Sequence, residues 1–361
     1  MKRLIVTDGE KPIYPIVIGR DFKTLADELA VQKLAGRKVC VVSESTVGPL
    51  YADEVCTELS KTGASVYRFI FKAGEENKNL GVVQDLYEFL IKNHFDRKDM
   101  LAALGGGVVG DLTGFAAATY LRGIRFIQIP TSLLAQTDSS VGGKTGVDFR
   151  SYKNMVGAFY QPVLVYMNMS VLSSLSKRQF ASGMGEIIKH GIIRDRDYFA
   201  WLADHVEEIK SLDPDTLEQM IYVSCQIKKE VVEHDQKEKG ERAILNFGHT
   251  LGHSIEKLCG FTLYHGECVV LGMICALRIS LVRGLISRAE YDSCISLFDA
   301  FGFPLTVSGI SADDVIRVSK SDKKMDRGVI QFILIHPFGH AVIDRTVTDE
   351  EMREALKEVL R

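Results

Sequence analysis

The sequence predicts two domains: an N-terminal α/β domain with a mostly parallel sheet, and a C-terminal domain that is mostly α-helical. Three observations predict this organisation. A chain of 361 residues has room for about two domains of roughly 150 residues each. Short β-rich runs alternate with helical patterns up to about residue 175, and after it the strand patterns nearly vanish. We therefore expect the domains at residues 1–175 and 176–361.

Five short apolar runs in the first half predict buried strands, because they are rich in β-branched and aromatic residues. They are Val39–Val42, Val66–Phe71, Met100–Leu104, Phe126–Ile129 and Val163–Met167. Helical patterns, including Leu80–Asn93 and Asp111–Leu121, lie between these runs. Such alternation is typical of a parallel sheet covered by helices.

The second half contains mainly helical patterns. Helices are expected at Phe180–Ile193, Pro214–Glu233, His249–Leu258, Gly266–Arg283 and Ala289–Phe301. Gly328–Ile335 and His340–Ile343 predict a late hairpin. A cleft between two domains of this kind is a common place for a ligand site.

The composition is that of an ordinary globular protein, with 46% hydrophobic and 25% charged residues. These values exclude disordered, collagen-like and coiled-coil chains. The 44 basic and 47 acidic residues give a net charge of −3, which provides no general attraction to nucleic acid.

The cysteines and apolar runs predict a cytoplasmic protein that does not enter a membrane. The seven cysteines are odd in number, scattered and without a CxxC pair, so we expect them to be reduced core residues. Acidic residues interrupt the first apolar stretch, so it does not resemble a signal peptide. The longest apolar run, Cys268–Leu277, is stopped by Arg278 and is too short to span a membrane.

A glycine-rich turn is the first candidate site. Residues 101–110 read LAALGGGVVG, and Gly105, Gly107 and Gly110 match G-x-G-x-x-G between a strand and a helix. Glycines there let the backbone approach a pyrophosphate at a helix start. The turn lies about 100 residues into the chain and Arg125 stands where an acid is usual, so simple helix–strand packing is an alternative. Glu44 is a candidate ribose-binding carboxylate, or an ordinary loop acid.

A second polar cluster follows at residues 129–146, which read IPTSLLAQTDSSVGGKTG, with Lys153 and Asn154 soon after. Loops at the carboxyl ends of parallel strands are where α/β proteins bind ligands. The GGKT sequence resembles the end of a P-loop, but Asp138 stands where the first glycine is required. A nucleoside triphosphatase is therefore disfavoured.

Metal-binding residue types cluster in the second half, in ASGMGEIIKHG (181–191), NFGHTLGH (246–253) and YHGE (264–267). His249 and His253 are spaced i, i+4, as in helical zinc sites. Residue 250 is Thr, so the general-base glutamate of HExxH is absent and a zinc protease is not expected. A single such histidine would be interpreted as a core residue, but the set with His265 and Glu186 favours a metal. Glu186 and His190 form a competing i, i+4 pair, so spacing alone does not decide the ligands.

Basic residues are numerous near these motifs, and in an acidic chain they predict a site for a phosphorylated, carboxylated metabolite. They are Arg122, Lys144, Lys153, Lys189, Lys228, Arg242, Lys323 and Lys324.

The combination of motifs resembles the 3-dehydroquinate synthase family of sugar-phosphate cyclases. The matching stretches include GGGVVGDLTGFAAATYLRG, IQIPTSLLAQTDSSVGGKTGV, KNMVGAFYQP, ASGMGEIIKHG, ERAILNFGHTLGH, YHGE and SDKK, in the family's order from about residue 40 to 324. The resemblance implies a Rossmann-like N-terminal domain that binds NAD⁺, a helical C-terminal domain with a divalent metal (Zn²⁺ or Co²⁺), and a homodimer.

The resemblance also implies roles for individual residues. The metal ligands would be Glu186, His249 and His265, and His253 would be a base or substrate contact. The remaining catalytic residues would be Glu238, Lys144, Lys189, Arg242 and Asn246. Further substrate contacts would be Arg122, Asp138, Asn154, Lys228 and Lys324. NAD⁺ would contact Glu44, Glu75, Lys78, Gly106, Gly107, Asp111, Thr131, Ser132 and Lys153. Arg122 is expected to reach the neighbouring subunit's site.

The implied activity is a carbon–oxygen lyase reaction of the shikimate pathway, which makes 3-dehydroquinate and phosphate from 3-deoxy-D-arabino-heptulosonate 7-phosphate. Two departures from the usual motifs, GGKTGVD for GGKTGVN and PTSLL for PTTLL, are conservative. One alternative is another sugar-phosphate cyclase, against which SSVGGKTGV argues. A second is an iron-type alcohol or glycerol dehydrogenase, which typically has GGGS and an aspartate ligand. A third is a non-catalytic metabolite sensor, which the complete set of catalytic positions disfavours.

Overall fold

The computed structural model describes residues 1–150, 152–238, 240–260, 262–321, 325–326 and 329–361. The chain forms two compact units. The first contains Met1–Ser174 and Leu217–Lys229, and the second contains Leu175–Thr216 and Glu230–Arg361. Leu217–Lys229 therefore groups with the first unit, although the sequence analysis assigned it to the second domain.

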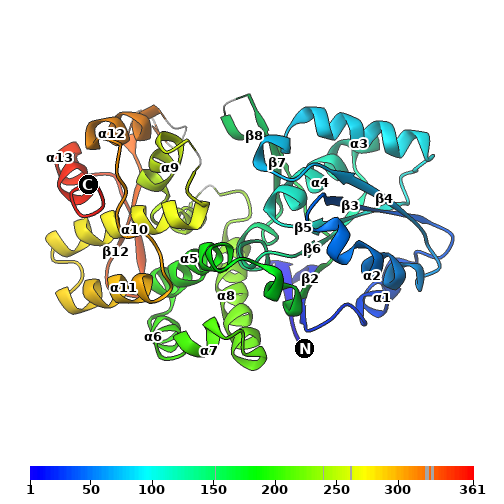
Figure 1. The fold of residues 1–361 in the computed structure, drawn as a ribbon, viewed down its shortest axis with the longest axis horizontal. Coiled ribbons are helices and arrows are strands. Elements are labelled where there is room, and N and C mark those ends of the chain that lie inside the picture. Colours follow the sequence, from blue (N-terminus) through cyan, green and yellow to red (C-terminus); the bar gives the residue numbers. More distant parts are fainter. Residues whose placement is uncertain (151, 239, 261, 322–324, 327–328) are drawn as a thin grey trace. The chain divides into compact units, whose positions relative to one another are not determined.

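The first unit is built on a seven-stranded sheet (Figure 1). Its strands in spatial order are β1 (Lys2–Asp8), β2 (Lys11–Gly19), β9 (Val165–Asn168), β6 (Arg125–Pro130), β5 (Met100–Gly105), β3 (Lys38–Glu44) and β4 (Ser65–Phe71). All neighbours from β2 to β4 pair in parallel, and β1 pairs antiparallel with β2. The mostly parallel sheet is confirmed.

Helices cover both faces of this sheet. One face packs against α1 (Leu25–Glu28) and α2 (Gly48–Ser60), and the other against α3 (Leu80–Lys92) and α4 (Gly107–Thr119). Along β3, Val39 and Val41 belong to the first core cluster, whereas Cys40 and Val42 belong to the second. Because successive side chains in a strand point to opposite faces, a strand buried on both faces is apolar throughout.

Shorter elements complete the first unit. The strands β7 (Lys144–Phe149) and β8 (Tyr152–Phe159) form a separate antiparallel pair. Short helical turns are η1 (Ala30–Gln32), η2 (Glu75–Asn77), η3 (Tyr120–Arg122), the π-turn η4 (Ala135–Ser139) and η5 (Met169–Ser174).

The second unit is mostly helical. Its helices are α5 (Lys177–Arg194), α6 (Arg196–Asp204), α7 (Val206–Lys210), the two ends of α8 (Pro214–His234), η6 (Glu241–Asn246), α9 (His249–Leu258), α10 (His265–Val282), α11 (Arg288–Ala300), α12 (Ala312–Ser321) and α13 (Asp349–Leu356). Its short strands are β10 (Met325–Asp326), β11 (Val329–Ile330), β12 (Phe332–Ile335) and β13 (Ala341–Asp344). The pairing of β12 with β13 confirms the late hairpin, although residue 328, where its first run was expected to begin, lies outside the described residues.

Local sequence signals explain where several helices begin. Ser176, Ser287 and Thr348 form capping boxes at the starts of α5, α11 and α13, and Asp213 caps α8. Each of these side chains accepts a hydrogen bond from a backbone N–H group that has no partner within the helix. The helix expected from Asp111 begins earlier, at Gly107, because the glycine turn itself forms the first helical turn.

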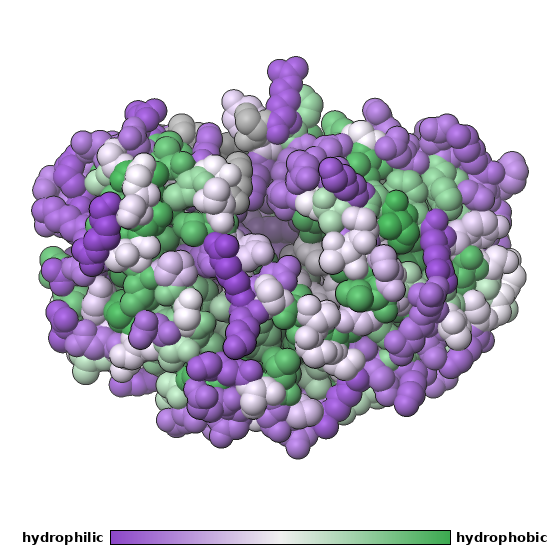
Figure 2. Space-filling model, viewed as in Figure 1, coloured by the Kyte–Doolittle hydropathy of each residue, from purple (hydrophilic) through white to green (hydrophobic). Residues whose placement is uncertain are grey.

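The apolar helix α10 lies in the core of the second unit. By length and composition it could cross a membrane, but 78% of it is buried inside the structure, as in the core helix of a globular protein. None of the seven cysteines, all of which the structure describes, forms a disulfide; six of them are buried, whereas Cys259 is partly exposed. On the face that Figure 2 shows, hydrophilic and apolar residues are interspersed.

Candidate active site

Three adjacent parallel strands of the first unit end at the same edge of the sheet, and each leads to a predicted site residue. β3 ends at Glu44, β5 leads into Gly106, and β6 leads into Thr131. The buried Glu44 carboxylate accepts hydrogen bonds from the backbone N–H groups of Thr46 (2.5 Å) and Val47 (2.9 Å). Open α/β sheets bind ligands at this edge.

The glycine turn joins β5 to α4. Gly105 ends the strand, Gly106 is the N-cap of the helix and Gly107 is its first residue. The first N–H groups of a helix have no intrahelical acceptors and can bind an anion. A Cβ atom at Gly110 would lie 2.7 Å from Oε1 of Gln128 on β6, so this glycine allows the helix to pack closely on the sheet. The glycine at 110 thus serves helix–sheet packing, and pyrophosphate binding at the start of α4 stays a prediction.

Lys78 connects predicted cofactor residues with Asn154, a predicted substrate contact. Its ammonium group donates hydrogen bonds to Oδ2 of Asp111 and to Oδ1 of Asn154, both at 2.6 Å. Burial alone would lower the pKa of Lys78, but the charges of Asp111 and Glu75 raise it above its ordinary value. Nζ of Lys153 lies 3.8 Å from Oε1 of Glu75, one of the two acids whose charge acts on Lys78. The structure thus brings these five predicted residues together around one buried cation.

The backbone of Asn154 is held in an unusual conformation by a residue that the sequence analysis did not assign to the site. Asn154 has a φ of 53°, in the left-handed region. Its N–H donates to Oδ1 of Asp148 at 2.7 Å, and the Asp148 N–H donates to the Lys78 carbonyl at 2.8 Å. The sequence contained a signal that Asp148 differs from the residue common in the family, because it is the residue that departs from the usual GGKTGVN motif.

Among three predicted substrate residues of the first unit, Lys228 and Asp138 form an ion pair, and Lys144 is exposed. Lys228, buried on the part of α8 that belongs to the first unit, pairs with the Asp138 carboxylate. Lys144 opens β7 and is exposed. It follows Gly143, whose φ of 66° lies in the left-handed region, which glycine adopts without strain.

Ser132 and Arg122 lie in turns of the same unit. The Ser132 hydroxyl accepts a hydrogen bond from the Ala135 N–H at 3.2 Å and would lie 3.5 Å from a Cβ atom on Gly106. Arg122 is exposed, and both it and Leu121 have left-handed backbones, with φ of 68° and 50°. Such conformations cost about 1–3 kcal/mol each in non-glycine residues and concentrate at functional sites.

Glu186, His249 and His265 come from three helices of the second unit and converge. The carboxylate of Glu186, on α5, is fully buried. Its Oε1 atom lies 3.6 Å from Nε2 of His249, on α9, and 3.5 Å from Nε2 of His265, on α10. A carboxylate and two imidazole nitrogens are a donor set that suits zinc or a similar divalent ion. The residues present therefore fit a metal.

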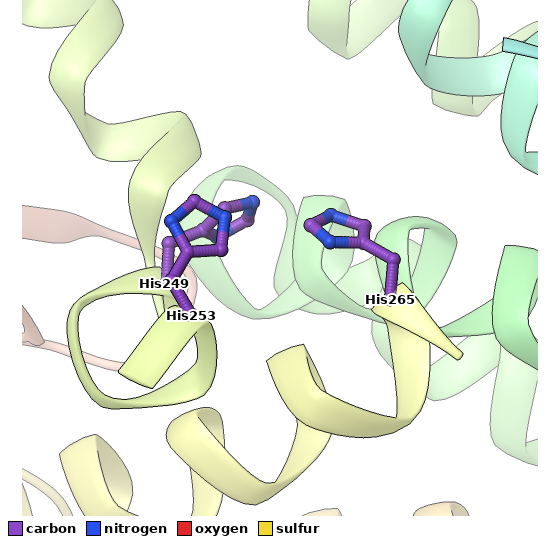
Figure 3. A group of neighbouring side chains, drawn as sticks. All are labelled: His249, His253 and His265. Atoms are coloured by element: carbon purple, nitrogen blue, oxygen red, sulfur yellow. The ribbon is translucent and has the colours of Figure 1, made fainter. Parts of the chain in front are cut away.

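His253 is a fourth member of this cluster. Its ring lies 5.0 Å from that of His249 and 5.7 Å from that of His265, measured between centroids. Figure 3 shows the rings of His249 and His253, from one helix, and the ring of His265, from the next, turned toward a common space. One nitrogen of each ring lies within 4.8 Å of the others, so the three histidines are a second arrangement that could hold an ion. The two arrangements share His249 and His265 and differ in the third ligand.

Glycines explain how three helices come close enough for these side chains to meet. A Cβ atom on Gly252 of α9 would lie 2.6 Å from the carbonyl oxygen of Cys268 on α10. A Cβ atom on Gly185 of α5 would lie 3.0 Å from the carbonyl oxygen of Gly266, also on α10. A side chain at either glycine would push apart two helices that carry candidate ligands. The glycines next to Glu186, His253 and His265 in the sequence therefore allow the close approach of these helices.

The two imidazoles are each oriented by a second acceptor. Nδ1 of His249 lies 3.1 Å from the Phe247 carbonyl oxygen, and Nδ1 of His265 lies 3.7 Å from Oε2 of Glu256. Burial alone would lower the pKa of His265, but Glu186 and Glu256 raise it to about 9. The two buried carboxylates thus favour a positive charge at the His265 ring. Glu256 was not among the predicted site residues, although its spacing from His249 and His253 places it on the same face of α9.

Lys189, Asn246 and Glu238 surround this cluster with polar contacts of the second unit. Lys189 pairs with Oε2 of Glu186, the carboxylate oxygen opposite to the one that faces the histidines, and donates to the Leu245 carbonyl at 2.6 Å. Asn246 donates from Nδ2 to Oε1 of Glu238 at 3.0 Å. The Glu238 backbone has a φ of 52°, in the left-handed region.

Arg242 is a buried cation in the turn before α9. Its guanidinium donates to the Gln236 carbonyl at 2.7 Å, and its backbone N–H donates to the Asp235 carboxylate at 3.2 Å. Lys324, the remaining predicted substrate contact, and its neighbour Lys323 lie outside the described residues.

Two family models match consecutive parts of the chain. "3-Dehydroquinate synthase N-terminal" matches residues 68–182, and "3-dehydroquinate synthase C-terminal" matches residues 183–325. The chain is 44% identical to the 3-dehydroquinate synthase of Acetivibrio thermocellus over 94% of both chains. It is 42% identical to that of Shewanella piezotolerans over 98% of this chain and 99% of the other.

The chain belongs to the 3-dehydroquinate synthase family. This family consists of carbon–oxygen lyases of the shikimate pathway, so the chain is an enzyme of aromatic amino acid biosynthesis with the family's activity.

Solved structures of other cyclases have the fold of this 3-dehydroquinate synthase family member. A 2-deoxy-scyllo-inosose synthase, in complex with carbaglucose-6-phosphate, NAD⁺ and Co²⁺, is 26% identical with a TM-score of 0.91, over 99% of this chain and 100% of that one. A 2-epi-5-epi-valiolone synthase from Streptomyces hygroscopicus, with NAD⁺ and Zn²⁺ bound, is 25% identical with a TM-score of 0.88, over 95% and 96%. A glycerol dehydrogenase from Schizosaccharomyces pombe, 15% identical with a TM-score of 0.68 over 95% and 87%, shares the fold alone.

Proposed function

We propose that the chain converts 3-deoxy-D-arabino-heptulosonate 7-phosphate to 3-dehydroquinate and phosphate, with NAD⁺ and a divalent metal ion as cofactors. The observation that carries the proposal is the buried Glu186 carboxylate, which faces Nε2 of both His249 and His265. In this reaction an alcohol is oxidised, phosphate is eliminated, the ketone is reduced again, the ring opens, and an intramolecular aldol reaction closes the carbocycle. The net reaction is redox-neutral.

When bound, NAD⁺ would accept and return a hydride, and Zn²⁺ or Co²⁺ would polarise the alcohol that is oxidised. We assign the metal to Glu186, His249 and His265. Lys189 supports this choice, because its ammonium pairs with the other oxygen of the fully buried Glu186 carboxylate and so leaves the first oxygen facing the two imidazoles. His253 remains beside the ligands as a base or substrate contact.

We assign NAD⁺ to the strand ends and the Lys78 cluster of the first unit. The N–H groups of Gly106 and Gly107 would bind its pyrophosphate, and Glu44 its ribose. Asp111 and Lys78 hold each other in place beneath the same helix start, since Asp111 lies one turn into α4. The remaining proposed contacts are Glu75, Thr131, Ser132 and Lys153.

The substrate carries a phosphate and a carboxylate, and the proposed contacts are mostly cationic. Lys144, Lys189 and Arg242 would bind these anions and orient the reacting carbons, which lowers the entropic part of the barrier. Asn246 and Glu238 are hydrogen-bonded to each other, so this pair could move a proton at a substrate hydroxyl. Asp138, Asn154, Lys228 and Lys324 complete the proposed substrate contacts.

We also propose that the chain acts as a homodimer in the cytoplasm, with Arg122 contributing to the partner's site. The exposed side chain and strained backbone of Arg122 support a role outside its own unit. Sedimentation velocity that gives a monomer of 40.2 kDa at micromolar concentration would contradict the dimer.

The activity is tested by comparing the amount of phosphate released with the amount of NADH formed. Purified protein is given the heptulosonate phosphate with Zn²⁺ or Co²⁺ and a trace of NAD⁺, and phosphate and NADH absorbance are followed together. We expect many phosphates released per NAD⁺ and no lasting rise in NADH, because the hydride returns to the same substrate molecule. The variant His265→Ala, treated with chelator, is the inactive control.

Two outcomes would favour the alternatives. Stoichiometric NADH from a simple polyol, without phosphate release from the heptulosonate, would indicate a dehydrogenase. Binding of carbaglucose-6-phosphate, the ligand of the 2-deoxy-scyllo-inosose synthase structure, without phosphate release from the heptulosonate would indicate another sugar-phosphate cyclase.

A further inference from the structure

We propose that Glu256 is a positioning residue for the metal ligand His265. Its carboxylate accepts a hydrogen bond from Nδ1–H of the imidazole and so directs the lone pair of Nε2 toward the metal. The inference deepens the proposed function and rests on it, because it concerns the same metal site.

The geometry of the His265 ring carries the proposal. Its two nitrogens face two different buried carboxylates, Nε2 toward Glu186 at 3.5 Å and Nδ1 toward Glu256 at 3.7 Å. Both nitrogens face an acceptor, but an Nε2 atom that binds a metal must supply its lone pair, so the single N–H group of the neutral imidazole is then on Nδ1, where Glu256 is its acceptor. With Nδ1–H facing Glu256, the lone pair on Nε2 faces the candidate metal position. The distance of 3.7 Å is that of an ion pair, and we expect it to shorten to a hydrogen bond when Nε2 binds a metal.

Burial makes Glu256 suitable for this role. The residue is only 5% exposed, so a charge there is costly unless a partner compensates it. Carboxylates that accept the second N–H group of a metal-binding histidine orient the ring and raise its basicity. The contact thus stabilises both the buried acid and the required tautomer of His265.

The two histidine ligands differ in this respect. Nδ1 of His249 faces the Phe247 carbonyl oxygen, a neutral acceptor two residues earlier in the chain. Nδ1 of His265 faces a charged side chain on a different helix, since Glu256 belongs to α9 and His265 opens α10. Glu256 and His249 are seven residues apart and share one face of α9. The contact therefore also couples the positions of the two ligand-bearing helices.

The experiment measures metal affinity, independently of turnover. Metal-free wild type, Glu256→Gln and Glu256→Ala are titrated with Co²⁺ in competition with a chromophoric chelator, and the visible Co²⁺ spectrum and the melting temperature of each metal-free protein are recorded. We expect an affinity loss of about 100-fold for Ala and about tenfold for Gln, whose amide oxygen still accepts a hydrogen bond but carries no charge. The Co²⁺ spectrum should change in both variants, because the ligand orientation changes.

The matched control is Glu58→Gln. Glu58, on α2, is also buried, at 7% exposed, but its carboxylate pairs with Lys61, the residue that follows this helix. This variant should bind Co²⁺ as the wild type does. Glu256→Gln preserves the volume of the side chain, so it carries the test if Glu256→Ala does not fold.

Wild-type affinity and an unchanged Co²⁺ spectrum in Glu256→Gln would overturn the inference, whatever its melting temperature. That result would leave the proposed function intact. A wild-type chain that binds neither Co²⁺ nor Zn²⁺ would instead overturn the metal site of the proposed function itself.

Discussion

The substitution Gly252→Ala tests whether close helix packing sets the geometry of the metal site. Gly252 lies on α9 between His249 and His253, and its neighbour across the interface is the carbonyl of Cys268 on α10. One added methyl group changes no charge and removes no proposed ligand. Any effect on metal binding must therefore come from the displacement of the two helices.

The size of the displacement follows from the structure. The new Cβ atom would lie 2.6 Å from the Cys268 carbonyl oxygen, whereas ordinary contacts begin at 3.4 Å, so the helices must separate locally by up to 3.4 − 2.6 = 0.8 Å. Metal–ligand distances tolerate only about 0.2 Å. A misplacement of about 1 Å in an active site costs roughly 100-fold in rate. We expect losses of about that size in both metal affinity and turnover.

The expected effect on stability is much smaller. Alanine is favoured over glycine in a helix by about 1 kcal/mol, and overpacking costs about 1–3 kcal/mol. The two effects oppose each other, so the metal-free protein should lose at most about 2 kcal/mol of unfolding free energy. Urea unfolding of the metal-free protein measures this value, and chelator competition measures the metal affinity.

The control on the same helix is Ser254→Ala. Ser254 is buried and donates a hydrogen bond of 3.3 Å to the Thr250 carbonyl, so its loss disturbs α9 without widening the interface. This variant should keep its affinity for Co²⁺. Equal affinities in wild type and Gly252→Ala would refute the reasoning, because the helices would then have absorbed the methyl group without moving the ligands.

Two further predictions concern other parts of the chain. Lys144→Ala should reduce kcat/KM by at least about tenfold, the loss of one charge-assisted contact to an anion. Lys61→Ala, which removes an exposed lysine that belongs to no proposed site, should leave kcat/KM unchanged; equal small effects would mean that GGKT is only a turn. Hydrogen bonding from Arg283 lowers the pKa of Glu351 from 4.5 to about 2, so this pair stabilises the fold fully above pH 4.5 and loses that contribution as the pH falls through 2. Glu351→Gln, which keeps the capping box with Thr348, should therefore lose on the order of 1 kcal/mol at pH 7 and match the wild type near pH 2 in urea unfolding; a difference independent of pH would contradict this assignment.

Much of the fold could be predicted because its elements have strong local signals. The buried strand β3 is apolar throughout, and α9 was expected with the bounds that it has, His249–Leu258. The antiparallel pair β1–β2 was missed, because Pro12 and Pro15 weaken the strand pattern of Lys11–Gly19. The pair β7–β8 was missed because it lies in a glycine-rich stretch that was interpreted as a binding loop.

The sequence by itself determined the α/β and helical halves, the glycine turn, and the residue types from which a metal site could be built. These depend on local periodicity and on motifs, which are written in consecutive residues. Spacing along one helix favoured His249 with His253, and it could not reveal that Glu186, 79 residues before His265, faces the His265 ring. Nor could it reveal that Glu256 faces the other side of that ring. Only the tertiary structure decided these contacts, because they depend on how closely α5, α9 and α10 pack, and that distance is set by glycines at the helix interfaces.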